Sequence, residues 1–134
     1  MKKILKKLSM FTLTAIMIAG TTINVAAFSE TLYSYSGWCG ISGLVTQGSF
    51  YNDDGVFFLN NNIESFKNGA TGLKMEALKH GVNGYEVVDT ATRNSTGNST
   101  VWMYGDPGEY KIKFVAIGIR NCKVYFNGTV HDDL

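Results

Sequence analysis

The sequence contains little proline, little cysteine and few charged side chains. One proline and fifteen glycines without regular spacing, in 134 residues, exclude a collagen-like chain and a proline-rich linker. Two cysteines are too few for a disulfide-dense miniprotein or for a zinc site with four cysteine ligands. Because 45% of the residues are hydrophobic, the chain can build a packed core, and a wholly disordered protein is excluded.

The signatures of common enzymes are also missing. The sequence contains no H-E-x-x-H, G-x-S-x-G, P-loop or dinucleotide-binding motif. A carboxylate pair for glycoside hydrolysis has no fixed sequence spacing, because the two residues meet only in the folded chain. A single small domain offers little room for the cleft that such a hydrolase needs. We therefore expect a protein that is not an enzyme and uses no cofactor, with a small hydrolase as the alternative.

The longest apolar run lies at the N-terminus, where residues 1–27 have the features of a secretory signal peptide. Four lysines precede the apolar segment Leu8–Gly20, and Val25–Ala27 supplies small residues for cleavage. The run is short for a membrane span of about 20 residues, and no stop-transfer pattern follows it, so a membrane anchor is the less favoured alternative. We expect cleavage before Phe28 and a secreted, extracellular bacterial protein, with residues 28–134 forming one domain.

Loss of this segment changes the charge balance. The whole chain has twelve Lys and Arg against eleven Asp and Glu, and residues 1–27 hold four of the lysines and none of the acids. Residues 28–134 therefore carry eight basic and eleven acidic side chains, a net charge of about −3. A mildly acidic domain lacks the basic surface that binds nucleic acid or anionic lipid. We expect no nucleic-acid partner and no stable membrane anchor.

The two cysteines, Cys39 and Cys122, lie near opposite ends of the predicted domain. In an exported protein such a pair most simply forms one disulfide. The bridge would close a loop of more than eighty residues, for which chain entropy predicts a stabilisation of roughly 4–5 kcal/mol. The alternative is a nucleophilic Cys39, which would need an activating base. Only His80 and His131 are available, and the sequence ties neither of them to Cys39.

Apolar and polar residues alternate with a period of two through much of the chain. The segment Glu109–Ile117 shows this most clearly: apolar residues at every second position face one way, and Glu109, Lys111 and Lys113 face the other. Thr71–Lys79 alternates in the same way, although its residue types also permit a helix. The alternation indicates β-strands with one buried face.

Turn signals separate the expected strands. Asn-Gly, Asp-Gly and Pro-Gly pairs are typical of tight turns, and they occur within residues 52–55, 68–69, 81–84, 106–108 and 127–128. The strands expected between them are 28–35, 44–51, 56–60, 71–79, 85–92, 100–104, 109–117 and the arms of a terminal hairpin, 122–126 and 129–131. A loop is expected at residues 60–62, and residues 63–67 are expected to form a short strand or a helical turn. This spacing predicts an all-β domain, a single antiparallel β-sandwich of the jelly-roll or Greek-key kind with seven to nine short strands and one disulfide.

The C-terminal third also resembles a known family. The segment Gly105–Phe114 (GDPGEYKIKF), followed by Lys123–Phe126 (KVYF), resembles the closing strands of secreted bacterial jelly-roll accessory domains of the pre-peptidase C-terminal type. In that family a glycine turn and a G-x-Y-x-I/V strand precede the last strand. The family's acidic, leucine-containing strand is replaced here by Thr71–Met75. The resemblance implies a jelly-roll fold and a role in binding substrates or surfaces.

Aromatic residues are frequent, with sixteen Phe, Trp and Tyr among the 107 residues that follow the predicted cleavage site. Tyr and Trp suit binding surfaces because each has an apolar face and a polar edge, whereas many aromatic residues of a small sandwich fill its core. Trp38 lies in a glycine-rich stretch and Trp102 lies next to a turn. The predicted ligand-binding residues are Trp38, Trp102, Tyr104, Tyr33 and Tyr35, with Tyr51 and Tyr125 as further surface candidates.

Acidic residues occur in two pairs, Asp53-Asp54 and Asp132-Asp133. With its neighbour asparagine, the first pair offers oxygen ligands of the kind that bind Ca²⁺. Its spacing is not that of an EF-hand, and turn composition alone explains it. His131 beside the second pair offers a base or a metal ligand, although an exposed chain end is the more common arrangement. We expect no metal, and Asp53 and Asp54 are the candidates if calcium binds.

These observations favour a small secreted binding protein without enzymatic activity. Its exposed aromatics and glycine-rich loops would contact a surface polysaccharide or an extracellular protein. The alternative is a secreted effector. An antimicrobial or membrane-active toxin would expose a contiguous apolar patch, and a protease inhibitor would present a rigid protruding loop, for which Gly37–Gly43 is the candidate.

Overall fold

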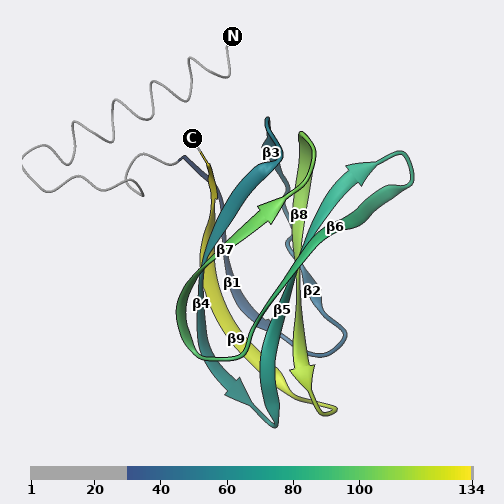
Figure 1. Ribbon diagram of the computed structural model, residues 1–134. Coiled ribbons are helices and arrows are strands. Elements are labelled where there is room, and N and C mark those ends of the chain that lie inside the picture. Colours follow the sequence, from purple (N-terminus) through teal and green to yellow (C-terminus); the bar gives the residue numbers. More distant parts are fainter. Residues whose placement is uncertain (1–29, 134) are drawn as a thin grey trace, which may run out of the picture.

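The computed structural model describes residues 30–133, which form nine β-strands (Figure 1). Among these residues no helix is long and apolar enough to cross a membrane. The predicted signal peptide, residues 1–27, and the predicted first mature residue Phe28 lie outside the described part. The strands are β1 Thr31–Cys39, β2 Leu44–Val45, β3 Phe50–Asn52, β4 Val56–Lys67, β5 Ala70–Gly81, β6 Gly84–Arg93, β7 Gly97–Tyr104, β8 Gly108–Gly118 and β9 Lys123–Asp132.

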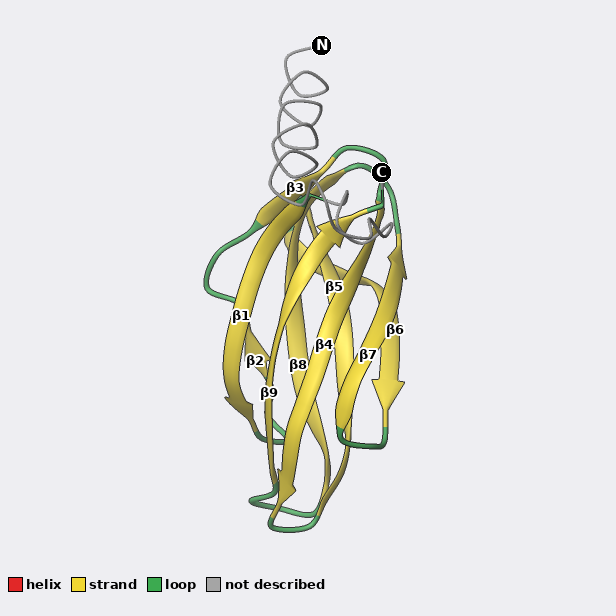
Figure 2. Cartoon of the chain, turned by 90° about the vertical axis from the view of Figure 1, so that its left-hand side faces the viewer, coloured by secondary structure: helices red, strands yellow, loops and turns green. Residues whose placement is uncertain are grey.

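The strands form two antiparallel sheets that pack face to face (Figures 1 and 2). The first sheet has the order β1-β9-β4-β7, and the second has the order β2-β8-β5-β6, with β3 also paired to β8. Except at β2–β3 and β5–β6, each connection between successive strands passes from one sheet to the other. This arrangement confirms the predicted all-β class with antiparallel pairing.

The inner faces of both sheets are apolar and enclose one core. In β8, Tyr110 and Phe114 are fully buried, whereas Lys111 and Lys113 are only half-buried, because successive strand residues point to opposite faces. The ring centroid of Phe57 in β4 lies 5.0 Å from that of Tyr110, so the two sheets meet through aromatic contacts. The predicted alternation in β8 is confirmed.

The segment whose residue types also permitted a helix is a strand. In β5, Leu73, Met75 and Ala77 are buried, and Lys74 and Glu76 between them point outward. A helix would spread these five residues around its axis, whereas a strand places the three apolar ones on one face. Burial of that face against the first sheet therefore decides the structure of this segment.

Two sequence signals that predicted turns or loops lie inside long strands. The predicted hairpin turn at Asn127-Gly128 is wrong, because β9 continues without a break through it. The predicted loop at residues 60–62 is also wrong, because β4 is continuous there. Gly128 serves close packing instead of a turn: a Cβ at this position would lie 2.4 Å from the carbonyl oxygen of Asn60 and 2.5 Å from the hydroxyl of Tyr35.

The substitution Gly128→Ala tests this packing role. The added methyl group would meet a backbone oxygen at the centre of the first sheet, so we expect a destabilisation of about 1–3 kcal/mol, the usual cost of overpacking. Gly81→Ala is the matched control, because the nearest atom to its Cβ lies 3.6 Å away. Urea unfolding of the two variants checks the prediction, and equal stability of both would contradict it.

The predicted strand 44–51 is split into β2 and β3. Both halves pair with β8, and Thr46 bridges the interruption between them. Its backbone N–H donates to the carbonyl oxygen of Ile112 at 2.9 Å, and its hydroxyl accepts a hydrogen bond from the N–H of Ile112 at 3.2 Å. The side chain thus replaces one strand bond, and the edge of the second sheet remains paired.

The predicted disulfide is not formed, because Cys39 and Cys122 are both buried and both free thiols. Cys39 stands opposite Val124 of β9, and Cys122 precedes that strand, so the two cysteines are not directly paired in the register. Burial raises the pKa of Cys39 to about 12, and the nearby Cys122 adds to the rise. A thiol with this pKa holds almost no thiolate at neutral pH, which argues against a nucleophilic Cys39.

Thiol titration checks the state of the two cysteines. We expect the native protein to react slowly with an aromatic disulfide reagent, because both sulfur atoms are buried in the core. In guanidinium chloride both cysteines should react. Failure of either cysteine to react after unfolding without reductant would contradict the free thiols of the structure.

Candidate functional site

The four strands of the first sheet lie side by side (Figure 2). Their outward face carries two rows of uncharged polar side chains that cross all four strands. Residues directly opposite one another in antiparallel strands share a face, so the strand register defines each row. We call these eight side chains the polar rows, and five of them are exposed, which opens their amides and hydroxyls to a ligand. One row is Ser34, Thr129, Asn60 and Thr100, and the other is Ser36, Asn127, Asn62 and Asn98.

Aromatic side chains flank the polar rows at both ends. At one end Phe58, Trp102 and His131 form the Trp102 cluster, in which the Phe58 ring centroid lies 4.8 Å from that of Trp102 and 5.2 Å from that of His131. At the other end Trp38 stands opposite Tyr125, and these two residues form the Trp38 pair. Trp38 is 49% exposed and Trp102 is 44% exposed, so both present ring surface to a ligand.

The length of this face follows from strand geometry. His131 of the Trp102 cluster and Tyr125 of the Trp38 pair are six residues apart on β9, which corresponds to about 20 Å at ~3.3 Å per strand residue. The polar rows fill the interval between them. A face of this length fits an extended chain of several linked units better than one small molecule.

The other outer face of the sandwich has a different character. Outward positions of β5 and β8 carry charged side chains, namely Lys74, Glu76, Lys111 and Lys113. The polar rows contain no charged side chain. A carboxylate contacts the rows at one edge, where Oε1 of Glu64 accepts a hydrogen bond from Nδ2 of Asn127 at 2.8 Å. Two cations lie at the margins of the outer face of the first sheet: Nζ of Lys123 is 4.5 Å from the ring centroid of Trp38, and Nη2 of Arg93 donates to the carbonyl oxygen of Thr100 at 3.2 Å. The centre of the face is neutral.

His131 is part of the neutral face and not an exposed chain end. It lies within β9, is half-buried, and its Nε2 is 2.6 Å from the hydroxyl of Thr129. Burial lowers the pKa of His131, because the charged imidazolium loses solvation when it is covered. At neutral pH the ring is therefore uncharged, in keeping with its stacking on Phe58.

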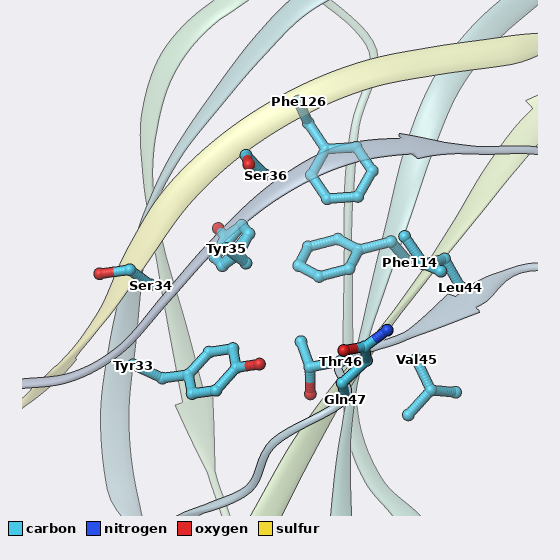
Figure 3. Close-up of a pocket in the computed structure, with 10 residues that line it drawn as sticks. All are labelled: Tyr33, Ser34, Tyr35, Ser36, Leu44, Val45, Thr46, Gln47, Phe114 and Phe126. Atoms are coloured by element: carbon cyan, nitrogen blue, oxygen red, sulfur yellow. The ribbon is translucent and has the colours of Figure 1, made fainter.

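Three of the five predicted ligand-binding residues lie on this sheet with exposed side chains, and two do not. Trp38 and Trp102 belong to the groups defined above, and Tyr104 at the end of β7 is 59% exposed. Tyr33 and Tyr35 are half-buried and point between the sheets, where both line a pocket (Figure 3), so they do not share the outer face that carries Trp38.

Tyr35 has a structural role. Its ring centroid is 4.7 Å from that of Phe114, and its hydroxyl donates to Oδ1 of Asn61 at 2.7 Å. Burial raises the pKa of Tyr35 well above its usual value, so the hydroxyl stays protonated. Tyr33 likewise accepts a hydrogen bond from the N–H of Gly48 at 3.1 Å. Both tyrosines line a pocket between the sheets, and Tyr33 holds the segment that follows β2 through its bond to Gly48.

The alternation of side chains along β1 distinguishes the outward-facing Trp38 from the inward-facing Tyr33 and Tyr35. In β1 the odd-numbered Tyr33 and Tyr35 face inward, and the even-numbered Ser34, Ser36 and Trp38 face outward. Because side chains alternate along a strand, Trp38 and the two tyrosines cannot share a face. The sequence alone does not predict the polar rows, because each row contains residues from four strands that are distant in the sequence. Only the strand register brings these residues together.

The candidate calcium ligands lie at one end of the sandwich. Asp53 and Asp54 follow β3 in a turn that crosses to the first sheet, and Asp132 at the end of β9 joins them. The adjacent Asp133 has its pKa raised to about 7, because it is partly buried and hydrogen-bonds to the carboxyl groups of Asp54 and Asp132. The two acidic pairs of the sequence therefore form a single cluster.

Comparisons with known proteins do not assign the chain to a family. No protein-family model and no curated protein sequence matches it. Among solved structures, PirA is similar with a TM-score of 0.47 and 12% identity, over 76% of this chain and 95% of that chain. A mitogen derived from Yersinia pseudotuberculosis has a TM-score of 0.42 and 14% identity, over 77% of this chain and 88% of that chain. Neither is a pre-peptidase C-terminal domain.

The lowered pKa of His131 predicts a pH-dependent stability. The imidazole of His131 binds a proton less well in the folded state than in the unfolded state. The folded protein therefore has its full stability above the unfolded pKa of about 6.5, and protonation of His131 lowers the free energy of unfolding as the pH falls. Between pH 7.5 and pH 5 we expect the Tm of the unchanged chain to fall further than the Tm of His131→Gln. His80→Gln is the control, because His80 is exposed. An identical pH response of the two variants would contradict the assignment.

Proposed function

We propose that this protein is a secreted, non-enzymatic binding protein whose first sheet holds an extended neutral polysaccharide. The polar rows with aromatic groups at both ends are the observation that carries this proposal. Sugar rings combine apolar faces with a rim of hydroxyl groups, so they suit aromatic surfaces and uncharged hydrogen-bonding partners together. Asn, Ser and Thr side chains donate and accept hydrogen bonds without the desolvation cost of a charged group.

The placement of these groups supports an extended ligand. The Trp102 cluster and the Trp38 pair would each stack on one ring of the polysaccharide, about 20 Å apart along β9. Between them, the amides and hydroxyls of the polar rows would contact successive sugar units. An acidic polysaccharide fits less well, because the domain carries a net charge of about −3 after the predicted cleavage and the polar rows contain no cation.

The inhibitor alternative has less support from the segment Gly37–Gly43. The strand β1 extends to Cys39, and the carbonyl oxygen of Gly40 accepts hydrogen bonds from the N–H groups of Gly43 at 3.2 Å and Ala116 at 3.0 Å. These bonds hold the segment against β8. A protease inhibitor would instead need a loop that stands away from the domain.

Affinity electrophoresis with soluble polysaccharides in the gel tests the proposal. We expect neutral glucans, mannans or galactomannans to retard the protein, and we expect alginate and hyaluronate to have a smaller effect. Retardation by acidic polysaccharides alone, or by none of this panel, would overturn the proposal. In the second case, an extracellular protein becomes the better candidate partner.

Substitution of the tryptophans locates the binding face. For the polysaccharide that binds best, Trp102→Ala and Trp38→Ala should each weaken binding about tenfold, which corresponds to the ~1.4 kcal/mol expected of a stacked aromatic contact. Tyr51→Ala is the matched control, because Tyr51 is 53% exposed but lies on β3 of the second sheet. Titration calorimetry measures the affinities, and an equal loss in the control would place the ligand elsewhere.

A further inference from the structure

Three carboxylates converge at the end of the sandwich where β3 and the C-terminus lie (Figure 1). Asp53 and Asp54 come from the turn between β3 and β4, and Asp132 comes from the end of β9, 78 residues further along the chain than Asp54. One oxygen atom from each of the three lies within 4.8 Å of the other two. Asp132 is only 1% exposed, so one member of the group is a buried carboxylate.

The spacing of these oxygens indicates the size of ion that they can hold. Ca²⁺ binds oxygen at about 2.3–2.6 Å, so two ligands on opposite sides of the ion are up to ~5 Å apart. Mg²⁺ binds at about 2.0–2.1 Å, which limits the same separation to ~4.2 Å. A group of oxygens spread over as much as 4.8 Å therefore suits Ca²⁺ without movement, whereas Mg²⁺ would require the turn to contract.

A buried amide beside the cluster supplies an independent indication. Asn52 is fully buried, and its Oδ1 has no hydrogen-bond donor. Its Nδ2 lies 3.4 Å from Oδ1 of Asp132 and 3.2 Å from the carbonyl oxygen of Val56, so the amide points at the cluster. A buried acceptor without a partner costs about 1–3 kcal/mol. A cation bound beside the cluster would give Oδ1 of Asn52 the partner that it lacks, while Nδ2 keeps its two acceptors.

We propose that Asp53, Asp54 and Asp132 bind a Ca²⁺ ion together with the amide oxygen of Asn52. The three carboxylates supply the charge, and the amide oxygen is a ligand type that Ca²⁺ commonly takes. Because Asp53 and Asp54 lie where the chain crosses between sheets, the ion would join that crossing to the last strand. The proposal does not depend on polysaccharide binding, since Asp132 points inward and its neighbour His131 points to the outer face.

Thermal unfolding of residues 28–134 with added metal tests the proposal. Extracellular calcium modules bind with dissociation constants near ~1 mM, so about 10 mM CaCl₂ should raise Tm by about 5 °C or more through mass action. The same concentration of MgCl₂ should raise it much less, and excess EGTA should reverse the calcium effect.

Matched carboxylate substitutions locate the site. In Asp53→Asn/Asp54→Asn the calcium-dependent rise in Tm should disappear, and in Glu86→Gln, which removes an exposed carboxylate from β6, it should be unchanged. Asparagine keeps the turn chemistry of the two positions, and Asp54→Asn alone serves if the double variant does not fold.

The outcomes that overturn the proposal are distinct. An unchanged Tm in CaCl₂ would show that no calcium site exists, and a full response in the double variant would place the ion elsewhere. Equal shifts with both metals would show general screening of the acidic cluster. Persistence of the calcium response in Asn52→Ala at unchanged affinity by calorimetry would remove the amide from the ligand set.

Discussion

Contact between aromatic rings of the two inner sheet faces holds the two sheets together. The ring centroids of Phe114 in β8 and Phe126 in β9 are 4.2 Å apart, and those of Phe57 in β4 and Phe50 in β3 are 5.2 Å apart. Each pair therefore joins the two sheets. Such pairs contribute more than their buried area alone. They also fix which side of each strand faces inward, because a shift of one residue would reverse every side chain of that strand.

Once the inner faces are committed to the core, the outer faces are free to differ in chemistry. The strand β9 shows this division: Val130 and Asp132 face inward, and Thr129 and His131 face outward. Neutral side chains occupy the middle of one outer face and lysines and glutamates occupy the other. Adjacent residues of one strand therefore belong to three different surroundings: the apolar core, the neutral polar rows and the acidic cluster.

Local alternation was sufficient to predict the fold class but not the site. Glu109–Ile117 and Thr71–Lys79 have the correct strand positions and inward faces in the sequence prediction, because side-chain alternation is local. Asn127-Gly128 misled it, since glycine also occurs where two strands approach closely. The polar rows and the meeting of Asp132 with Asp54 depend on strand register and on contacts between distant segments, which no local pattern contains.

The rigid setting of Asn127 bears on how the protein ages. An Asn-Gly pair in a flexible segment deamidates readily, because the glycine nitrogen must swing round to attack the side-chain carbonyl. Here the pair lies in a central strand between β1 and β4, and Nδ2 of Asn127 is bonded to Glu64. The backbone cannot reach the cyclic intermediate without breaking this pairing. Asn68-Gly69, in the left-handed turn after β4, and Asn83-Gly84, in the turn between β5 and β6, have no such protection, so chemical damage would accumulate at these two turns before it reached the neutral face.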